Sequence, residues 1–174
     1  MAWQPTHKQQ TRERILSSAA KLFTTEGFDK VSIDQIMHNA NLTRGAFYAH
    51  FTSKSALYSE AILASARNSV RSLPNGFSTC ELTSAYLSEE HVKGLNRRCP
   101  LAFLVTDIGK QDEQIKNTYT RIFQGMINML ESSGLDREKA LQQAVLMVGG
   151  VAIGRALNDD SLLAELLQSC KNLA

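Results

Sequence analysis

Proline is scarce in this sequence of 174 residues, and its few occurrences leave long stretches uninterrupted. Only three prolines occur, and all lie outside the stretches in which apolar residues recur with helical spacing. Proline removes a backbone donor and breaks helices, so its scarcity there favours helices. No stretch alternates apolar and polar residues for long enough to indicate a strand. The sequence therefore predicts an all-α fold.

Cysteine is also scarce, and its pattern excludes two classes of site. Cys80, Cys99 and Cys170 are odd in number and widely spaced, with no C-x-x-C pair. This spacing favours neither a disulfide framework nor a zinc site, and we predict no metal ligand. A reducing compartment, the cytoplasm, is the simplest interpretation.

Long apolar runs are missing as well. The first five residues, 1–5, contain no apolar core of the kind that a signal peptide requires. The most apolar run, residues 145–157, is too short to span a bilayer and contains Arg155. We therefore expect neither a signal peptide nor a membrane partner.

Motifs of catalysis are lacking too. The sequence contains no glycine-rich phosphate loop, no paired-carboxylate motif and no metal-ligand spacing. Asp107 and Asp112 are isolated acids, which we interpret as surface residues or helix caps. The sequence thus gives no support to an enzyme, and we predict no catalytic residue and no cofactor.

What the sequence does contain is an ordinary globular composition with an uneven charge. Hydrophobic residues make up 43% and charged residues 21%, which is typical of a folded chain. Residues 1–72 carry nine basic and five acidic side chains, whereas residues 73–174 carry ten basic and twelve acidic ones. A basic N-terminal part followed by a slightly acidic C-terminal part favours a polyanion-binding site in the N-terminal part.

Two short helices joined by a tight turn are the most informative pattern. Ser32 and Gln35 form a capping box that begins a helix over residues 33–40. Asn41 tolerates the left-handed conformation of a turn, and Thr43 caps a second helix over residues 44–51. A helix-turn-helix has this form, and the early residues of its second helix reach base edges.

The second of these helices is polar on one side and aromatic on the other. Phe47 and Phe51 can pack inward, so that Arg44, Tyr48 and His50 project outward. An arginine binds guanine or phosphate with two hydrogen bonds, and tyrosine or histidine can donate to phosphate. Gly45 allows close approach to the DNA backbone, and Lys54 at the start of the next helix adds a phosphate contact.

Residues 12–58 resemble the DNA-binding domain of the TetR/AcrR family of transcriptional regulators. The match is ungapped and specific in its order, with Ala49 as a departure where many members carry an aromatic residue or histidine. The residues that carry it are Arg12-Glu13-Arg14-Ile15-Leu16, Ala19 to Phe23, Glu26-Gly27-Phe28, Val31 to Ile36 and Leu42 to Tyr58.

The resemblance implies a bacterial, homodimeric repressor of about nine helices that binds a palindromic double-stranded operator and is released by a small molecule. The expected domains are a helix-turn-helix domain at residues 1–52, a connecting helix at 53–72, and a ligand-binding and dimerisation domain at 73–174. We predict that DNA is contacted by Ser32, Thr43, Arg44, Gly45, Ala46, Tyr48, His50 and Lys54.

The body is predicted to hold the effector. An aromatic and methionine-rich face suits an adaptable apolar ligand. The predicted lining residues are Cys99, Phe103, Tyr119, Phe123 and Met126. Cys99 also follows Arg97 and Arg98, so a thiol sensor for oxidants or electrophiles stays open beside the interpretation of Cys99 as a buried apolar residue. A DNA-binding dimer without a ligand switch is a further alternative.

The C-terminal helices are predicted to form the dimer interface. Small side chains recur with helical spacing, and bulky leucines follow from the last helix, so two copies could form a four-helix bundle. The predicted interface residues are Ala140, Ala144, Val148, Ala152, Leu163 and Leu167. The other histidines, His7, His38 and His91, are expected to be exposed and without a role.

Overall fold

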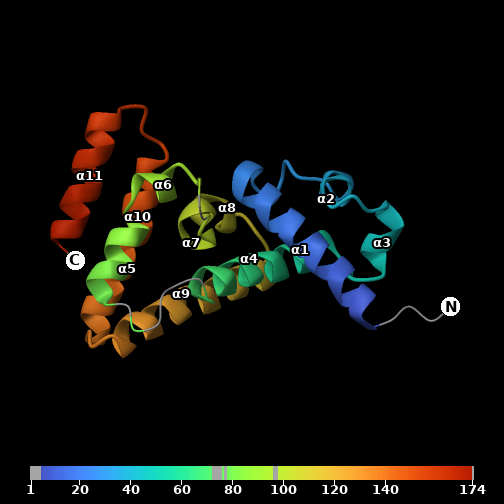
Figure 1. Ribbon diagram of the computed structural model, residues 1–174, viewed down its shortest axis with the longest axis horizontal. Coiled ribbons are helices and arrows are strands. Elements are labelled where there is room, and N and C mark those ends of the chain that lie inside the picture. The colour runs from blue at the N-terminus through green and yellow to red at the C-terminus, as the bar shows by residue number, and fades with distance from the viewer. Residues whose placement is uncertain (1–4, 72–75, 77, 96–97, 174) are drawn as a thin grey trace.

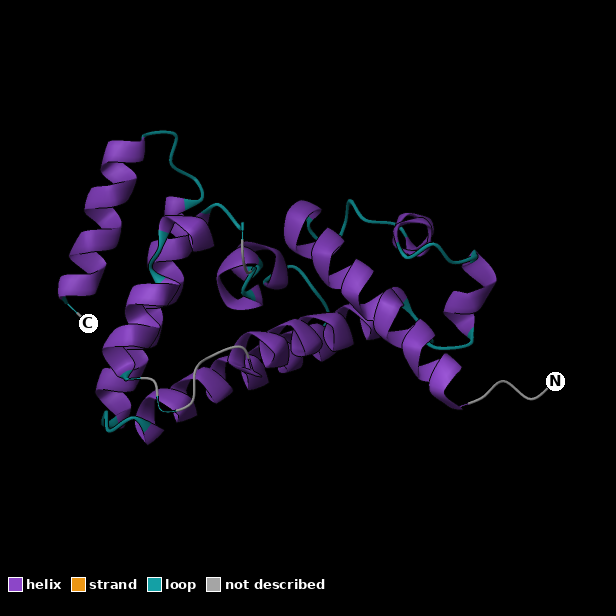
Figure 2. Ribbon diagram, viewed as in Figure 1, coloured by secondary structure: helices purple, strands orange, loops and turns teal. Residues whose placement is uncertain are grey.

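The computed structural model describes residues 5–71, 76, 78–95 and 98–173, and these form eleven helices and no strand (Figures 1 and 2). The all-α prediction is confirmed. The helices are α1 (Pro5–Glu26), α2 (Ile33–Asn39), α3 (Arg44–Tyr48), α4 (Lys54–Arg71), α5 (Thr79–Tyr86), α6 (Glu89–Val92), α7 (Pro100–Phe103), α8 (Val105–Ile108), α9 (Glu113–Ser132), α10 (Arg137–Gly154) and α11 (Asp160–Asn172).

Helices begin where the sequence provides a capping side chain. Ser32 Oγ accepts from the Gln35 N–H at 3.2 Å, while Gln35 Oε1 accepts from the Ser32 N–H at 2.7 Å. Such bonds satisfy backbone donors that a helix start leaves open. Ser78 and Glu81 form a second capping box at α5, and the side chains of Asp136 and Asp159 accept from backbone N–H groups at the starts of α10 and α11. The capping box expected at Ser32 and Gln35 is therefore confirmed.

The expected helix ends are less accurate. The second helix of the pair is a short α3 that ends at Tyr48 instead of Phe51, and Thr43 at its N-cap position makes no side-chain cap bond. Residues 100–108 form two short helices, because the backbone departs from helical geometry at Leu104 (φ −120°, ψ 3°). This division contributes to the difference between eleven helices and the nine expected.

The elements form a small head and a longer body (Figure 1). Helices α1 to α3 make the head, and α4 leaves it to run beside α9 along the body. Helices α5, α6, α10 and α11 gather at the opposite end, with α7 and α8 between the two groups. A single cluster of buried apolar side chains extends from Phe23 and Phe47 in the head to Leu130 and Leu163 in the body.

The body end is held by a close contact at two glycines of α10. A Cβ at Gly150 would lie 2.8 Å from Leu87 Cδ2, and one at Gly154 would lie 2.7 Å from Leu163 Cδ1. Both separations are shorter than carbon atoms tolerate, so glycine lets α5 and α11 approach α10 closely. Among the described residues, no helix combines the length and the apolar character needed to cross a membrane.

Two sequence expectations concern segments that the structure does not describe. The domain boundary expected between residues 72 and 73 lies outside the described residues. Arg97, which was expected to favour a reactive Cys99, is also outside them. The boundary between the connecting helix and the body stays a prediction.

Candidate nucleic-acid interface and body cavity

The turn between α2 and α3 orients the two helices of the head. Asn41 adopts the left-handed conformation, with φ of 53°, as its short polar side chain allows. The Leu42 N–H donates to Met37 O at 2.9 Å, and the Asn41 N–H donates to His38 O at 2.9 Å. These bonds close the end of α2 and turn the chain sharply into α3.

The inner side of α3 is aromatic. Phe47 and Phe51 are buried, and their ring centroids lie 5.9 Å apart. The Arg12 guanidinium from α1 lies 4.9 Å from the centroid of the Phe51 ring, a distance typical of a cation–π contact. These contacts fix which side of α3 faces solvent.

The outer side of α3 carries Arg44 and Tyr48. The side chain of Arg44 is 60% exposed, and Tyr48 is 61% exposed. Arg44 Nη1 donates to Asp34 Oδ2 on α2 at 2.8 Å. A hydrogen bond with Tyr48 and the charge of Asp34 raise the pKa of Arg44. The sequence expectation that these two side chains face outward is met.

Small or hydroxyl-bearing residues surround this edge. Gly45 is exposed, and apart from its own helical turn a Cβ there would meet no atom of the described residues within 4 Å. Thr43 is exposed and makes no cap bond, whereas the hydroxyl of exposed Ser32 is used in the capping box. Ala46 is half-buried. Gly45 therefore has no packing role within the chain.

His50 and Lys54 are turned further inward than expected. His50 is half-buried, and its Nδ1 is enclosed without a hydrogen-bond partner among the described residues. Burial, followed by the charges of Lys8 and Arg12, lowers the pKa of His50, so its imidazole is neutral at pH 7. Lys54 Nζ lies 4.1 Å from the centroid of the Phe28 ring, and burial lowers its pKa.

Asp107 connects the head to the body. Its Oδ2 accepts from Tyr58 Oη on α4 at 2.9 Å and from the Phe28 N–H at 3.1 Å. Burial, followed by the Asp107 carboxylate, raises the pKa of Tyr58 above its ordinary value. The sequence predicted a surface residue or a cap here. Asp107 is half-buried and is instead a tether between α8, α4 and the segment after α1.

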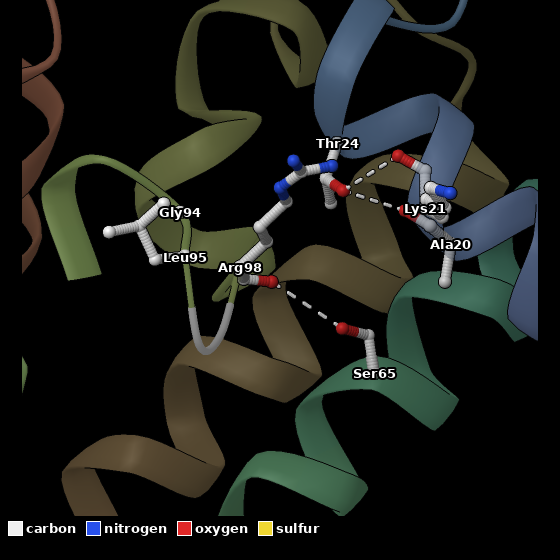
Figure 3. Close-up of a pocket in the computed structure, with 7 residues that line it drawn as sticks. All are labelled: Ala20, Lys21, Thr24, Ser65, Gly94, Leu95 and Arg98. Atoms are coloured by element: carbon white, nitrogen blue, oxygen red, sulfur yellow. Dashed lines mark hydrogen bonds between the residues drawn. The ribbon is translucent and has the colours of Figure 1, made fainter. Parts of the chain in front are cut away.

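A second link lies beside the first (Figure 3). Arg98, just before α7, extends its guanidinium toward α1 and donates to Thr25 Oγ1, while its carbonyl accepts from Ser65 Oγ of α4 at 3.5 Å. Arg98 and Ser65 border a pocket of about 290 Å³. The segment that leads into α7 and α8 therefore contacts both helices that carry the head.

A larger cavity of about 890 Å³ lies in the body, between the second half of α4, α5, α6 and α9. Of the residues predicted to bind the effector, Cys99 and Met126 line this cavity. Phe103, Tyr119 and Phe123 are not among its lining residues: the Arg155 guanidinium lies 3.6 Å from the Phe103 ring centroid, and Tyr119 Oη donates to Leu101 O at 2.7 Å. The wall of this cavity is mainly apolar.

Cys99, Tyr86 and His91 meet at one wall of this cavity. Burial raises the pKa of the Cys99 thiol, which keeps it protonated and weakly nucleophilic. The expectation that His91 is exposed is wrong, because it is buried and its Nδ1 donates to Tyr86 O at 2.6 Å. In the described residues, no group of three or more histidine, cysteine, aspartate or glutamate side chains could hold a metal ion.

The apolar residues of α10 and α11 divide into an inner and an outer set. Of the predicted interface residues, Ala152 is half-buried and the other five are buried within the protomer. These residues pack α10 and α11 within the protomer. Helical spacing alone does not distinguish a face that packs in the core from a face that forms an interface. The large apolar side chains that α10 and α11 leave exposed are Leu141, Val145, Ile153 and Leu162, with Leu173 directly after α11.

Comparison with sequence families gives a match in the head. Residues 15–61 match the family described as bacterial regulatory proteins, tetR family. The HTH-type transcriptional regulator AcrR of Shigella flexneri is 46% identical over 52 residues, which are 30% of this chain and 24% of that protein. YerO of Bacillus subtilis, also named an HTH-type transcriptional regulator, is 23% identical over 88% of this chain and 52% of its own length. The chain thus spans about half or less of these relatives.

Comparison with solved structures extends the likeness to the whole fold. NemR of Escherichia coli in its reduced form superposes with a TM-score of 0.76 at 18% identity, covering 94% of this chain and 96% of NemR. A TetR-family transcriptional regulator from Agrobacterium tumefaciens gives a TM-score of 0.76 at 18% identity, with coverage of 95% and 97%. At this identity the likeness concerns the fold.

Proposed function

Because the chain belongs to the TetR family of bacterial regulatory proteins, we propose that it is a homodimeric transcriptional repressor. It binds a palindromic operator in the bacterial cytoplasm, where the chromosome lies, and a small molecule in the body cavity releases it. The observation that carries this proposal is the outer edge of α3, where Arg44 and Tyr48 are exposed beside Gly45 while Phe47 is buried.

This edge suits the major groove. An α-helix fits that groove, and an arginine at its start can bind guanine O6 and N7. The Asp34 carboxylate holds the Arg44 guanidinium at the surface in the absence of DNA. Thr43 offers a hydroxyl that makes no cap bond, so it can donate to phosphate. The inward positions of His50 and Lys54 make them weaker candidates for direct contact.

A second copy of the chain supplies the recognition helix that binds the second half-site of the operator. Leu141 and Val145 lie one turn apart on α10. Leu162 lies on α11, which packs against α10, and Leu173 directly follows α11. Exposed apolar residues gathered on two adjacent helices are typical of an interface. We propose that these residues, instead of the buried set predicted from sequence, meet their counterparts in a four-helix bundle.

The switch we propose connects the cavity to the head through two elements. Helix α4 lines the cavity at its C-terminal half and carries Tyr58 in its first half. The α7–α8 segment has Cys99 and Leu101 at the cavity and Asp107 at the head. A ligand that shifts either element alters the separation of the two recognition helices, which must be about 34 Å for successive major grooves.

The two alternatives receive less support. A cavity of about 890 Å³ is in the size range of drug-like ligands, which favours a ligand switch over an unswitched dimer. The raised pKa of Cys99 reduces its thiolate fraction, which disfavours a thiol sensor. The curated relatives are named as regulators and not as enzymes.

We expect Arg44→Ala to weaken operator binding by about 1–3 kcal/mol, because one bidentate base contact is lost. The measurement is fluorescence anisotropy with an operator selected from a random DNA library, compared with a scrambled duplex. Arg137→Ala is the matched control, since Arg137 is also an exposed arginine in a surface ion pair but lies on α10. Equal operator affinity for wild type, Arg44→Ala and the control would contradict the proposal.

We expect Gly45→Ala to leave stability unchanged or slightly raised, because alanine favours helix and nothing of the chain opposes its Cβ. Operator affinity should nevertheless fall by about 1 kcal/mol or more, since the added methyl group separates α3 from the DNA backbone. Thermal unfolding and anisotropy are measured on the same samples. Gly109→Ala, at another open glycine, should change neither; a variant at position 45 that binds like wild type would refute this contact.

A further inference from the structure

We propose that the body cavity takes an amphipathic organic anion, with an apolar body inside and an anionic head group at the arginines of its lining. This inference rests on the proposed function in one respect, namely that the cavity is the effector site. It goes further in assigning the chemical class of the effector, for which the sequence suggested only an apolar molecule.

The interior of the cavity is suited to an apolar chain or ring. Met126, Met129 and Met147 contribute three flexible thioether side chains, and Leu82 and Ile122 add branched ones. Methionine adapts its shape to irregular apolar ligands. Burial of apolar surface therefore supplies most of the affinity.

Three arginines line the cavity and give its wall a positive charge. Arg67 and Arg71 lie one turn apart on α4, and Arg121 comes from α9, which packs beside α4. Glu90 is the one acidic residue in the described lining. The excess of positive charge favours an anion, and planar guanidinium groups bind carboxylate, sulfate or phosphate oxygens with two hydrogen bonds.

These three arginines differ from all others that the structure describes. None of the three forms an ion pair, hydrogen bond or ring contact with another described residue. Every other described arginine is engaged with a carboxylate, a carbonyl, a hydroxyl or an aromatic ring: Arg12, Arg14, Arg44, Arg98, Arg137 and Arg155. The described arginines without such a partner are thus those at the cavity, where they are exposed, so an anion can bind them without displacing a side chain of the protein.

The test compares ligands that share an apolar chain and differ in head group. Isothermal titration calorimetry on the full chain measures binding of decanoate, decyl sulfate, decanol and decyltrimethylammonium. We expect both anions to bind, decanol to bind about tenfold more weakly or worse, and the cation to bind least. Equal affinities for all four, tighter binding of the cation, or no binding of either anion would overturn the proposal.

Variants then assign the effect to the arginines. Arg121→Gln, and Arg67→Gln combined with Arg71→Gln, should each lower decanoate affinity about tenfold while decanol affinity stays within about twofold. Arg121→Lys should recover part of the loss because it restores the charge. Arg137→Gln, outside the cavity, should have no effect. Loss of decanoate and decanol binding to the same extent would contradict an anion site.

The outcome separates this inference from the proposed function. Operator binding is measured by anisotropy with and without saturating decanoate. Arginine-dependent binding of decanoate with no change in operator affinity would support the ligand class and refute the switch. Operator binding by a protein that takes up none of the anions would refute the ligand class and leave the DNA-binding assignment intact.

Discussion

The Val145→Glu variant is expected to be monomeric. Val145 is 62% exposed on α10 and is one of the apolar residues that we assign to the dimer interface. In a two-fold interface the substitution introduces one charge from each copy, and a buried charge without a partner costs several kcal/mol. Sedimentation velocity measures the change, with wild type as a dimer and the variant as a monomer of 19.3 kDa.

The same variant should bind the operator about 100-fold more weakly or worse, because a monomer reads one half-site instead of two. Val105→Glu is the control, since Val105 is an exposed apolar residue on α8, away from α10 and α11. The control should remain dimeric and bind DNA. A dimeric Val145→Glu protein would move the interface to another face of the molecule.

Asp107→Ala is expected to lower the free energy of unfolding by about 2–4 kcal/mol, because it leaves two donors, Tyr58 Oη and the Phe28 N–H, without their acceptor. Asp107→Asn should lose less, since an amide oxygen can still accept. Urea denaturation followed by circular dichroism measures both. Thr106→Ala, at the exposed neighbouring position, should have a small effect; equal stabilities for all of these proteins would exclude the tether.

Loss of the tether should also weaken communication between the cavity and the head. If Asp107 transmits the ligand signal, Asp107→Asn will bind the effector with nearly normal affinity and release DNA less completely. The coupling free energy, typically about 1–3 kcal/mol, is obtained from operator affinity with and without ligand. An unchanged coupling in this variant would assign the signal to α4 alone.

The features predicted best from sequence are those that depend on neighbouring residues. Ser32 and Gln35 form a capping box, and Asn41 adopts the left-handed turn, because both require only local bonds. The outward direction of Arg44 and Tyr48 follows equally from the spacing of Phe47 and Phe51 along one short helix. Local pattern was therefore sufficient to define the edge of the head.

The features predicted poorly depend on residues far apart in the chain. Asp107 acts on Phe28 across 79 positions, and no local pattern indicates that bond. The spacing of Ala140, Ala144 and Val148 correctly indicated one apolar face, but both a protomer core and a dimer interface require such a face. Tyr119 and Phe123 were expected at the cavity on periodicity alone, which does not define where neighbouring helices leave space.

The attachment of α11 has a consequence for the thermodynamics of the protein. Helix α11 packs mainly on α10, through Leu163 and Cys170 against the glycines of that helix, and leaves Leu162 exposed. If a second copy covers the exposed side, part of the native state forms only on association. The midpoint of thermal denaturation would then rise with protein concentration, since subunit binding and folding share one equilibrium.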